Sequence, residues 1–455
     1  MKFYLVLWIC KFISEIVNII DNTRGTKLAG EIACKLYGDE FIGKFKNINP
    51  EKTVFVTGTN GKSTTNNIIT HTLRMSGKTV ASNLEGANLI TGVATTLIKN
   101  SLYFGKFKKE FLVLEVDERS LVRVCKHLQP NNLCITNIQK DQMQRNAEPD
   151  IIYQVIKSII HEDLTIYVNN QEPRGKSLEQ FVSKVIYFGM EKNEKSFVKD
   201  GFYDITMPCP ICNNRLKFNY YNIDNVGDYE CESCGFKPKE DVEYAAKNIN
   251  YENNEFMVDN VTYKVPYSEP HFIYDFMAAI VVCKNLGVED ISEAFVNFKN
   301  VGGRTGTIKY GSKELKYLKV KTENPETFQS TIDSIIADKT NKIVVLALEE
   351  LAEFFPPFTN TFYAYDCSFD KLKDANIERY ICSSRAVAYD SANILKYAGV
   401  PKEKITVVPT DDDGAIVKEL NKYDIDNIYL ITWSGKYKRL SKYIKEMPKQ
   451  YEEEK

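Results

Sequence analysis

A glycine-rich turn between a short apolar run and a helical pattern is the stretch of this sequence best suited to chemistry. The turn reads Thr-Gly-Thr-Asn-Gly-Lys-Ser-Thr over residues 57–64. Successive backbone N–H groups in such a turn point towards one phosphate, and the following helix adds the positive end of its dipole. Lys62 would reach the outer phosphates, and the Ser63 hydroxyl would help to hold Mg²⁺. The pattern predicts a nucleotide site formed by Gly58, Thr59, Asn60, Gly61, Lys62, Ser63 and Thr64.

The spacing of this turn differs from that of the standard phosphate loop, whose first glycine would fall where this chain has Val56. The shorter pattern resembles the nucleotide loop of Mur ligases and folylpolyglutamate synthetases. The resemblance implies an enzyme that uses ATP to make a carboxylate reactive towards an amine.

Four of the eleven cysteines form two Cys-x₂-Cys pairs, Cys209 with Cys212 and Cys231 with Cys234. Thiolate pairs at this spacing predict a tetrahedral zinc site in a small ribbon at about residues 203–240. Four thiolates leave no open position for water, which favours a structural role. The other seven cysteines are scattered in apolar contexts and are predicted to be small buried hydrophobes in a reducing cytoplasm.

Acidic residues end the next apolar run, residues 111–118, and a further strand-like run at 130–138 leads into Asp141. Strands that alternate with helices predict an α/β fold with a mainly parallel sheet, whose carboxyl edge carries the ligand site. We therefore expect Glu115 and Asp141 on the magnesium side of the phosphates, together with Ser63.

The same segments carry a narrower resemblance. Glu-Val-Asp-Glu at 115–118 and the Asn-x-x-x-Asp segment from Asn137 to Asp141 resemble the central domain of a Mur ligase. Gln142 stands where amino-acid-adding Mur ligases usually have histidine. That glutamine, the inserted four-cysteine ribbon and the Leu-Lys-Tyr-Ala-Gly ending of residues 384–399 resemble the MurT family of synthetase subunits. The resemblance implies nucleotide contacts by Asn137 and by Arg304, which precedes the C-terminal domain.

The domain arrangement follows from this resemblance. We expect an N-terminal helical segment at 1–45, a Mur ligase-like ATP-binding domain at 46–305 with the ribbon inserted in it, and a C-terminal α/β domain at 306–455. In this family the last domain contacts a GatD-type glutaminase, and one of its acids completes the partner's Cys-His pair by orienting the histidine. Asp366 is our first choice for that acid and Asp390 our second.

The resemblance implies ATP-dependent amidation of the α-carboxylate of D-isoglutamate in the lipid II stem peptide, through an acyl phosphate. Ammonia would come from the glutaminase subunit in a heterodimer, and ATP, Mg²⁺ and a structural Zn²⁺ would be the cofactors. No cysteine of this chain sits in a Gly-x-Cys-x-Gly turn, so the glutaminase nucleophile must belong to the partner.

Three other functions stay open at this point. A plain Mur-type ligase would add an amino acid without a partner, although Gln142 and the ribbon oppose it. A zinc-containing ATPase that binds nucleic acid is disfavoured by the net charge of −2 and by a ribbon without a basic, aromatic-rich patch. A non-catalytic scaffold that still binds nucleotide is the third.

The N-terminal twenty residues are apolar enough to raise the question of membrane insertion. Lys11 and Glu15 interrupt the run, so we expect a packed helix with a broad buried face formed by Phe3, Leu7, Ile9, Phe12, Ile13, Ile16, Ile19 and Ile20. A cytoplasmic protein with at most a peripheral membrane contact is the resulting expectation.

Overall fold

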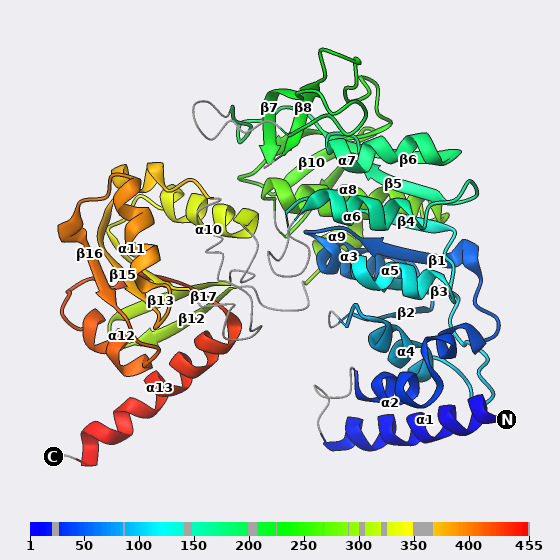
Figure 1. Cartoon of the computed structure of the whole chain (residues 1–455), viewed down its shortest axis with the longest axis horizontal. Helices are drawn as coiled ribbons and strands as arrows, with labels where there is room; N and C mark the ends of the chain where they lie inside the picture. Colours follow the sequence, from blue (N-terminus) through cyan, green and yellow to red (C-terminus); the bar gives the residue numbers. More distant parts are fainter. Residues whose placement is uncertain are drawn as a thin grey trace. The chain divides into compact units, whose positions relative to one another are not determined.

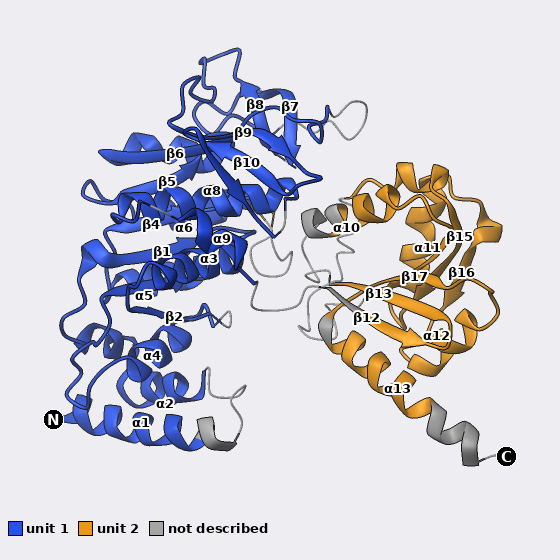
Figure 2. Cartoon of the chain, turned by 180° about the vertical axis from the view of Figure 1, so that it is seen from behind, with its two compact units in different colours: residues 1–139, 149–302 blue, residues 140–148, 303–455 orange. Residues whose placement is uncertain are grey.

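The structure is a computed structural model, and two compact units make up the chain (Figure 2). Unit 1 comprises residues 1–139 and 149–302, and unit 2 comprises residues 140–148 and 303–455. The structure describes residues 1–20, 27–84, 87–140, 148–198, 207–223, 225–266, 268–289, 291–299, 305–319, 325–348 and 367–453.

A nine-stranded sheet forms the centre of unit 1, in the order β11-β10-β9-β6-β5-β4-β1-β3-β2 (Figure 1). Neighbouring strands from β2 to β9 pair in parallel, and β9, β10 and β11 pair antiparallel at one edge. The strands are β1 (Thr53–Thr57), β2 (Val80–Ser82), β3 (Phe111–Glu115), β4 (Asn132–Ile135), β5 (Thr165–Asn169), β6 (Lys184–Met190), β9 (Tyr244–Asn250), β10 (Glu255–Val258) and β11 (Val261–Lys264).

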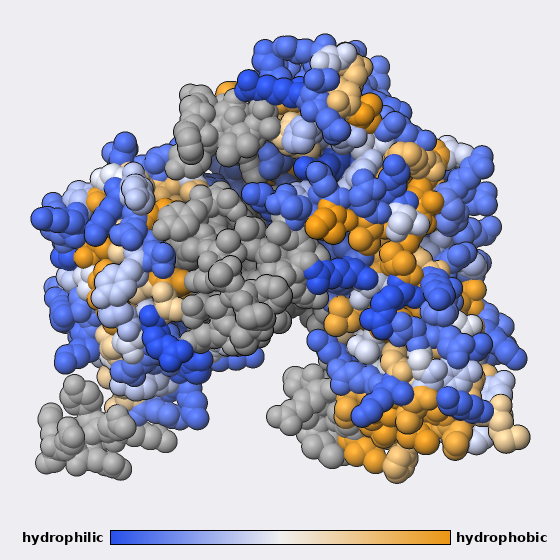
Figure 3. All heavy atoms as spheres, in the orientation of Figure 1, coloured by the Kyte–Doolittle hydropathy of each residue, from blue (hydrophilic) through white to orange (hydrophobic). Residues whose placement is uncertain are grey.

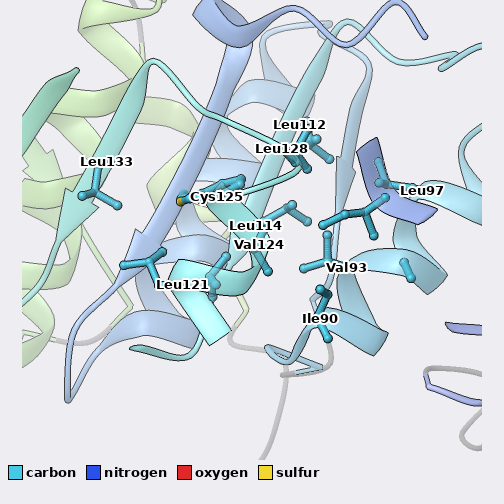
Figure 4. Packing of buried hydrophobic residues seen from close by; sticks show 14 of the residues in the cluster. Ile90, Val93, Leu97, Leu112, Leu114, Leu121, Val124, Cys125, Leu128 and Leu133 are labelled. Atoms are coloured by element: carbon cyan, nitrogen blue, oxygen red, sulfur yellow. The ribbon is translucent and has the colours of Figure 1, made fainter. Parts of the chain in front are cut away.

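Helices cover both faces of this sheet, because successive side chains of each buried strand point to opposite sides. Val54 and Val56 pack with α3 (Lys62–Met75), α8 (Pro270–Asn285) and α9 (Ser292–Val296). Phe55 packs on the other face. That face is covered by α4 (Ile90–Lys99), α5 (Glu118–Cys125) and α6 (Pro149–Lys157); Figure 4 shows Leu112 and Leu114 of β3 among side chains of α4 and α5. The predicted parallel α/β fold is confirmed.

The N-terminal residues pack within unit 1. Helix α1 (Lys2–Ile20) buries Phe3, Val6, Leu7 and Cys10 against α2 (Leu28–Tyr37) and α4, beyond the β2 edge of the sheet (Figure 1). The predicted helix is confirmed, but its predicted buried face is partly wrong. Ile9, Phe12 and Ile16 are exposed because the opposite side of the helix packs on the core. None of the helices in the described ranges has the length and apolar character that a transmembrane span requires.

The four-cysteine segment is inserted between β6 and β9. Its centre is an antiparallel hairpin of β7 (Lys217–Ile223) and β8 (Val226–Glu230), which lies between the two cysteine pairs in sequence. A short helix, α7 (Pro173–Ser177), follows β5.

Unit 2 has a six-stranded sheet in the order β12-β13-β17-β14-β15-β16, parallel except for the β12–β13 hairpin. Its strands are β12 (Thr305–Tyr310), β13 (Lys313–Lys319), β14 (Lys342–Ala347), β15 (Ile377–Ser383), β16 (Ile405–Val408) and β17 (Asn427–Thr432). Helices α10 (Pro325–Ala337) and α11 (Ala388–Tyr397) cover one face, and α12 (Asp413–Leu420) and α13 (Ser434–Glu453) cover the other. This is the predicted C-terminal α/β domain. Short 3₁₀ turns occupy Asp39–Lys44, Pro50–Lys52, Leu178–Phe181, Asp370–Asp374 and Lys402–Lys404.

Candidate functional site

The glycine-rich turn lies where the carboxyl ends of β4, β1 and β3 meet. In the sheet register Glu115 is beside Val56, and Ile135 is beside Thr57. Gly58 and Gly61 have φ of 121° and 82°, which L side chains rarely adopt. A Cβ on Gly58 would lie 2.4 Å from Thr136 Oγ1, and one on Gly61 would lie 2.2 Å from Asp275 Oδ1. Both positions therefore require glycine, for conformation and for space.

The segment after β4 holds this turn in place. Asn60 N donates to Asn137 Oδ1 at 2.9 Å, and Asn137 Nδ2 donates back to the Asn60 carbonyl at 3.1 Å. Thr59 Oγ1 donates to the Gln139 carbonyl and accepts from Gln139 N, each at 3.0 Å. Asn137 thus positions the backbone of the turn, while a direct nucleotide contact by Asn137 stays a prediction. Sequence reasoning missed Gln139, which no motif marked.

Helix α3 begins directly after the turn and offers an anion site. Its N-cap residue, Gly61, makes no side-chain cap. The N–H groups of a first helical turn have no acceptor within the helix, and the helix dipole favours negative charge there. Ser63 is half-buried in this first turn, and its hydroxyl has no hydrogen-bond partner among the described residues. Thr64, beside it, is buried.

Lys62 is buried and its ammonium group is held inside the site. Lys62 Nζ donates to Glu118 Oε1 at 2.7 Å, to the Thr59 carbonyl at 3.0 Å and to the Gly58 carbonyl. Glu118, the first residue of α5, is 1% exposed. Sequence reasoning did not assign it a role, although it ends the Glu-Val-Asp-Glu run from which Glu115 was chosen. For Lys62 to contact a phosphate, its bond to Glu118 must weaken or break.

Glu115 meets the requirements of a cation ligand. It is 2% exposed, and its Oε1 accepts from Asn88 Nδ2 at 3.1 Å. Its backbone is fixed by Asn83, whose amide donates to the Glu115 carbonyl and accepts from Glu115 N. Glu115 Oε2 is buried without a hydrogen-bond partner among the described residues. A buried carboxylate oxygen of this kind at the edge of a phosphate site fits a hard cation such as Mg²⁺.

Asp141, the other predicted magnesium ligand, and Arg304, a predicted nucleotide contact, both lie outside the described residues. Asp366, our first choice for the acid that serves the glutaminase, also lies outside them. Asp390, the second choice, is half-buried in the first turn of α11.

Helix α8 connects the ribbon to the glycine-rich turn. Asn222 of β7 donates to Tyr274 Oη at 3.1 Å, and Tyr274 Oη donates to Gln171 Oε1 at 2.8 Å. The next residue, Asp275, accepts from Thr65 Oγ1 of α3 at 3.2 Å and lies against Gly61. The carboxylate of Asp275 thus supports the start of α3.

The four predicted zinc ligands come together. The sulfur atoms of Cys209, Cys212, Cys231 and Cys234 all lie within 4.8 Å of one another. The Cys209–Cys234 and Cys212–Cys231 sulfur atoms are 3.7 and 3.5 Å apart, close to the separation of about 3.8 Å that tetrahedral Zn–S bonds impose. The donor set therefore fits a closed, four-coordinate metal site.

The remaining seven cysteines are separate from this cluster. All are free thiols, and all are buried except Cys34, which is half-buried. Burial raises the pKa of Cys125 and of Cys382 to about 12, so these groups stay protonated, as the sequence predicted for small buried hydrophobes.

Residues 56–207 match the Mur ligase middle domain, and residues 321–435 match the MurT ligase C-terminal domain. The fold is similar to that of a pseudomurein peptide ligase type C from Methanothermus fervidus, with a TM-score of 0.65, 21% identity and coverage of 92% of this chain and 83% of that one. It is also similar to MurF ligase from Thermotoga maritima in complex with ADP, with a TM-score of 0.55, 16% identity and coverage of 92% and 85%. These likenesses confirm the predicted Mur ligase-type fold.

Two relatives carry a more specific name. The MurT subunit of the glutamine-hydrolyzing lipid II isoglutaminyl synthase from Streptococcus pneumoniae is 30% identical over 417 residues, which are 90% of this chain and 90% of that protein. The MurT subunit from Staphylococcus aureus is 28% identical over 363 residues, 79% of this chain and 80% of that protein. Since the similarity spans nearly the whole of both chains and includes both matched domains, this chain belongs to the MurT family.

Proposed function

We propose that this chain is the ATP-dependent synthetase subunit of a glutamine-dependent amidotransferase that acts on lipid II. The observation that carries the proposal is the 30% identity to a named MurT subunit over nine tenths of each chain. It is supported by the positive φ of Gly58 and Gly61, and by the buried Lys62 at the start of α3. The substrate would be the α-carboxylate of D-isoglutamate in the stem peptide, and the product D-isoglutamine.

The reaction takes two steps. A carboxylate oxygen attacks the γ-phosphorus of ATP, and the bond between that phosphorus and the oxygen bridging it to the β-phosphate breaks. ADP departs, and the substrate becomes an acyl phosphate. Ammonia then attacks the acyl carbon, loses a proton, and inorganic phosphate leaves as the amide forms. Lys62 and the N–H groups at the start of α3 would stabilise the charge on the transferred phosphoryl group. Nucleotide contacts by Asn137 and Arg304 belong to the proposal.

The proposal includes two metal sites. Ser63, Glu115 and Asp141 would hold Mg²⁺, which neutralises charge on the phosphate oxygens. The four clustered cysteines would hold a structural Zn²⁺, which would stabilise a hairpin with too small a core to fold alone.

The partner would be a GatD-type glutaminase in a heterodimer, acting at the cytoplasmic face of the membrane. Its Cys-His pair needs an oriented histidine, and Asp366, with Asp390 as the second choice, would provide the carboxylate from this chain. Ammonia formed there would be used by the synthetase site.

The test co-purifies the chain with the glutaminase and measures phosphate release with lipid II, ATP and glutamine. Lys62→Ala should be inactive with either nitrogen source. Asp366→Asn should lose glutamine-dependent turnover and recover it with free ammonium, because only the delivery of ammonia is lost. Asp390→Asn tests the second choice in the same way. Asp374→Asn, an exposed acid of the same unit, is the control and should behave as wild type.

Turnover by the wild type only with an added amino acid would instead identify a plain Mur-type ligase. ATP binding without turnover on any of these substrates would identify a scaffold. Either result would overturn the proposed amidation.

A further inference from the structure

One side of α1 exposes large apolar side chains. Leu5, Trp8, Ile9, Phe12 and Ile16 recur at three- and four-residue spacings, so they form one stripe along the helix. Phe12 is 65% exposed and Leu5 57%. The opposite side of the same helix is buried against α2 and α4, which fixes the stripe in position.

The loop after α4 extends this stripe. Leu102, Tyr103 and Phe104 are 47, 57 and 67% exposed. Trp8 Nε1 donates to the Tyr103 carbonyl at 2.7 Å, and the Trp8 and Phe104 rings are 6.3 Å apart in an edge-to-face arrangement. Helix and loop thus form one surface, the α1 patch: Leu5, Trp8, Ile9, Phe12, Ile16, Leu102, Tyr103 and Phe104. Figure 3 shows apolar residues gathered over the region of α1 and α2, at the lower right.

A contiguous apolar surface of this kind usually marks an interaction site, because leaving it in water is unfavourable. Its composition indicates which kind of partner it fits. Trp8, Tyr103 and Phe104 combine apolar rings with the polar groups of Trp and Tyr, which is the composition found at membrane–water interfaces.

The charge around the patch supports the same partner. The chain as a whole has 59 basic and 61 acidic residues. The segments that build or adjoin the patch, residues 1–20, 27–46 and 99–109, have only four acids, Glu15, Glu31, Asp39 and Glu40. Against them stand ten lysines: Lys2, Lys11, Lys27, Lys35, Lys44, Lys46, Lys99, Lys106, Lys108 and Lys109. An excess of six positive charges complements an anionic surface.

We propose that the α1 patch binds the surface of an anionic lipid bilayer. The apolar side chains would enter the boundary between headgroups and acyl chains, with α1 lying in the plane of the interface. Exposed lysines such as Lys2, Lys106 and Lys108 would face the lipid phosphates, whereas Lys11 is held inside by the Ile98 and Ser101 carbonyls. The inference deepens the proposed function, because a lipid-linked substrate would be met at that surface. Binding itself requires no lipid II and no turnover, so the two proposals fail separately.

The test is co-sedimentation with vesicles that contain no lipid II, either pure phosphatidylcholine or phosphatidylcholine with phosphatidylglycerol. The wild type should pellet with the anionic vesicles, less with the neutral ones, and less again as salt is raised. The double variant Leu5→Asp/Phe12→Asp should partition at least about tenfold less. The matched control is Tyr397→Asp, which changes an 85% exposed ring of unit 2, whereas the patch belongs to unit 1; it should pellet like the wild type.

Folding of the double variant is checked by its melting temperature and its affinity for an ATP analogue, both of which should be unchanged. Equal pelleting of the double variant and wild type would overturn the proposal. So would failure of the wild type to bind anionic vesicles. Sedimentation velocity gives a third outcome that would overturn the proposal. If the wild type sediments as a dimer or heterodimer and the double variant as a single chain, the patch is a protein interface.

Discussion

At the scale of single residues, the contact between Lys62 and Glu118 determines how the site can meet a nucleotide. Both side chains are buried, and the ammonium group is already neutralised by a carboxylate 2.7 Å away. A phosphate would have to compete with Glu118 for this charge, so we expect the ion pair to oppose nucleotide binding, and removal of either partner to leave the other buried and unpaired.

Glu118→Gln should therefore bind an ATP analogue several-fold more tightly than the wild type, because the neutral amide competes less for Lys62. Without nucleotide it should be less stable, by on the order of 1–3 kcal/mol, since the ammonium group loses its opposite charge in a buried place. Calorimetric titration and thermal melts measure the two effects. The control is Glu110→Gln, whose pair with Lys52 is exposed and should contribute little. Unchanged affinity in Glu118→Gln would show that Lys62 does not exchange partners.

At the scale of elements, α3 has a glycine with positive φ at each end, which allows a matched comparison. Gly61, at 82°, precedes the helix, and Gly77, at 76°, follows it. A Cβ on Gly61 would collide with Asp275, whereas one on Gly77 would have nothing within 4 Å. Each alanine costs about 1 kcal/mol of backbone strain.

Gly61→Ala should also lose affinity for the ATP analogue by at least about tenfold, because relief of the collision moves the turn or α8. Gly77→Ala should keep wild-type affinity and should lower the melting temperature only by the backbone strain. Equal affinities in the two variants would mean that the turn is not the phosphate site.

The ribbon also contacts the helix that borders the glycine-rich turn. Asn222 of the ribbon bonds to Tyr274 of α8, and the next residue, Asp275, bonds to Thr65 of α3. If the four cysteines bind zinc, inductively coupled plasma mass spectrometry should find one zinc ion per chain. Cys231→Ser should lose it, and Cys34→Ser, outside the cluster, should keep it. Loss of the metal should lower both the melting temperature and the affinity for the ATP analogue, because α8 loses its contact with an ordered β7. A metal-free wild type with full stability would argue against a structural zinc site.

These elements also show what a sequence can and cannot predict. The glycine-rich turn and the cysteine pairs were predictable because each is specified by residues a few positions apart. Asp275 was not, since its partner Thr65 is 210 residues away in the chain. The exposed stripe of α1 was read as part of a buried face because periodicity shows that apolar residues share a side, and not what covers that side.

At the scale of the whole molecule, the two compact units have separate cores, and the glycine-rich turn belongs to unit 1. Chains with several cores commonly unfold in more than one step. We expect two calorimetric unfolding transitions. An ATP analogue should raise the midpoint temperature of one of them, and this rise should be absent in Lys62→Ala.

Two buried phenylalanines assign the transitions. Phe276 lies in the core of unit 1 and Phe328 in that of unit 2, and both are fully buried. Each alanine variant leaves a cavity that costs about 3–5 kcal/mol in its own core. Phe276→Ala should therefore lower the midpoint temperature of the transition that responds to the nucleotide. Phe328→Ala should lower only the midpoint temperature of the other transition. A single transition that both variants lower equally would mean that the units unfold together, so that nucleotide bound in unit 1 would also stabilise the C-terminal domain proposed to meet the glutaminase.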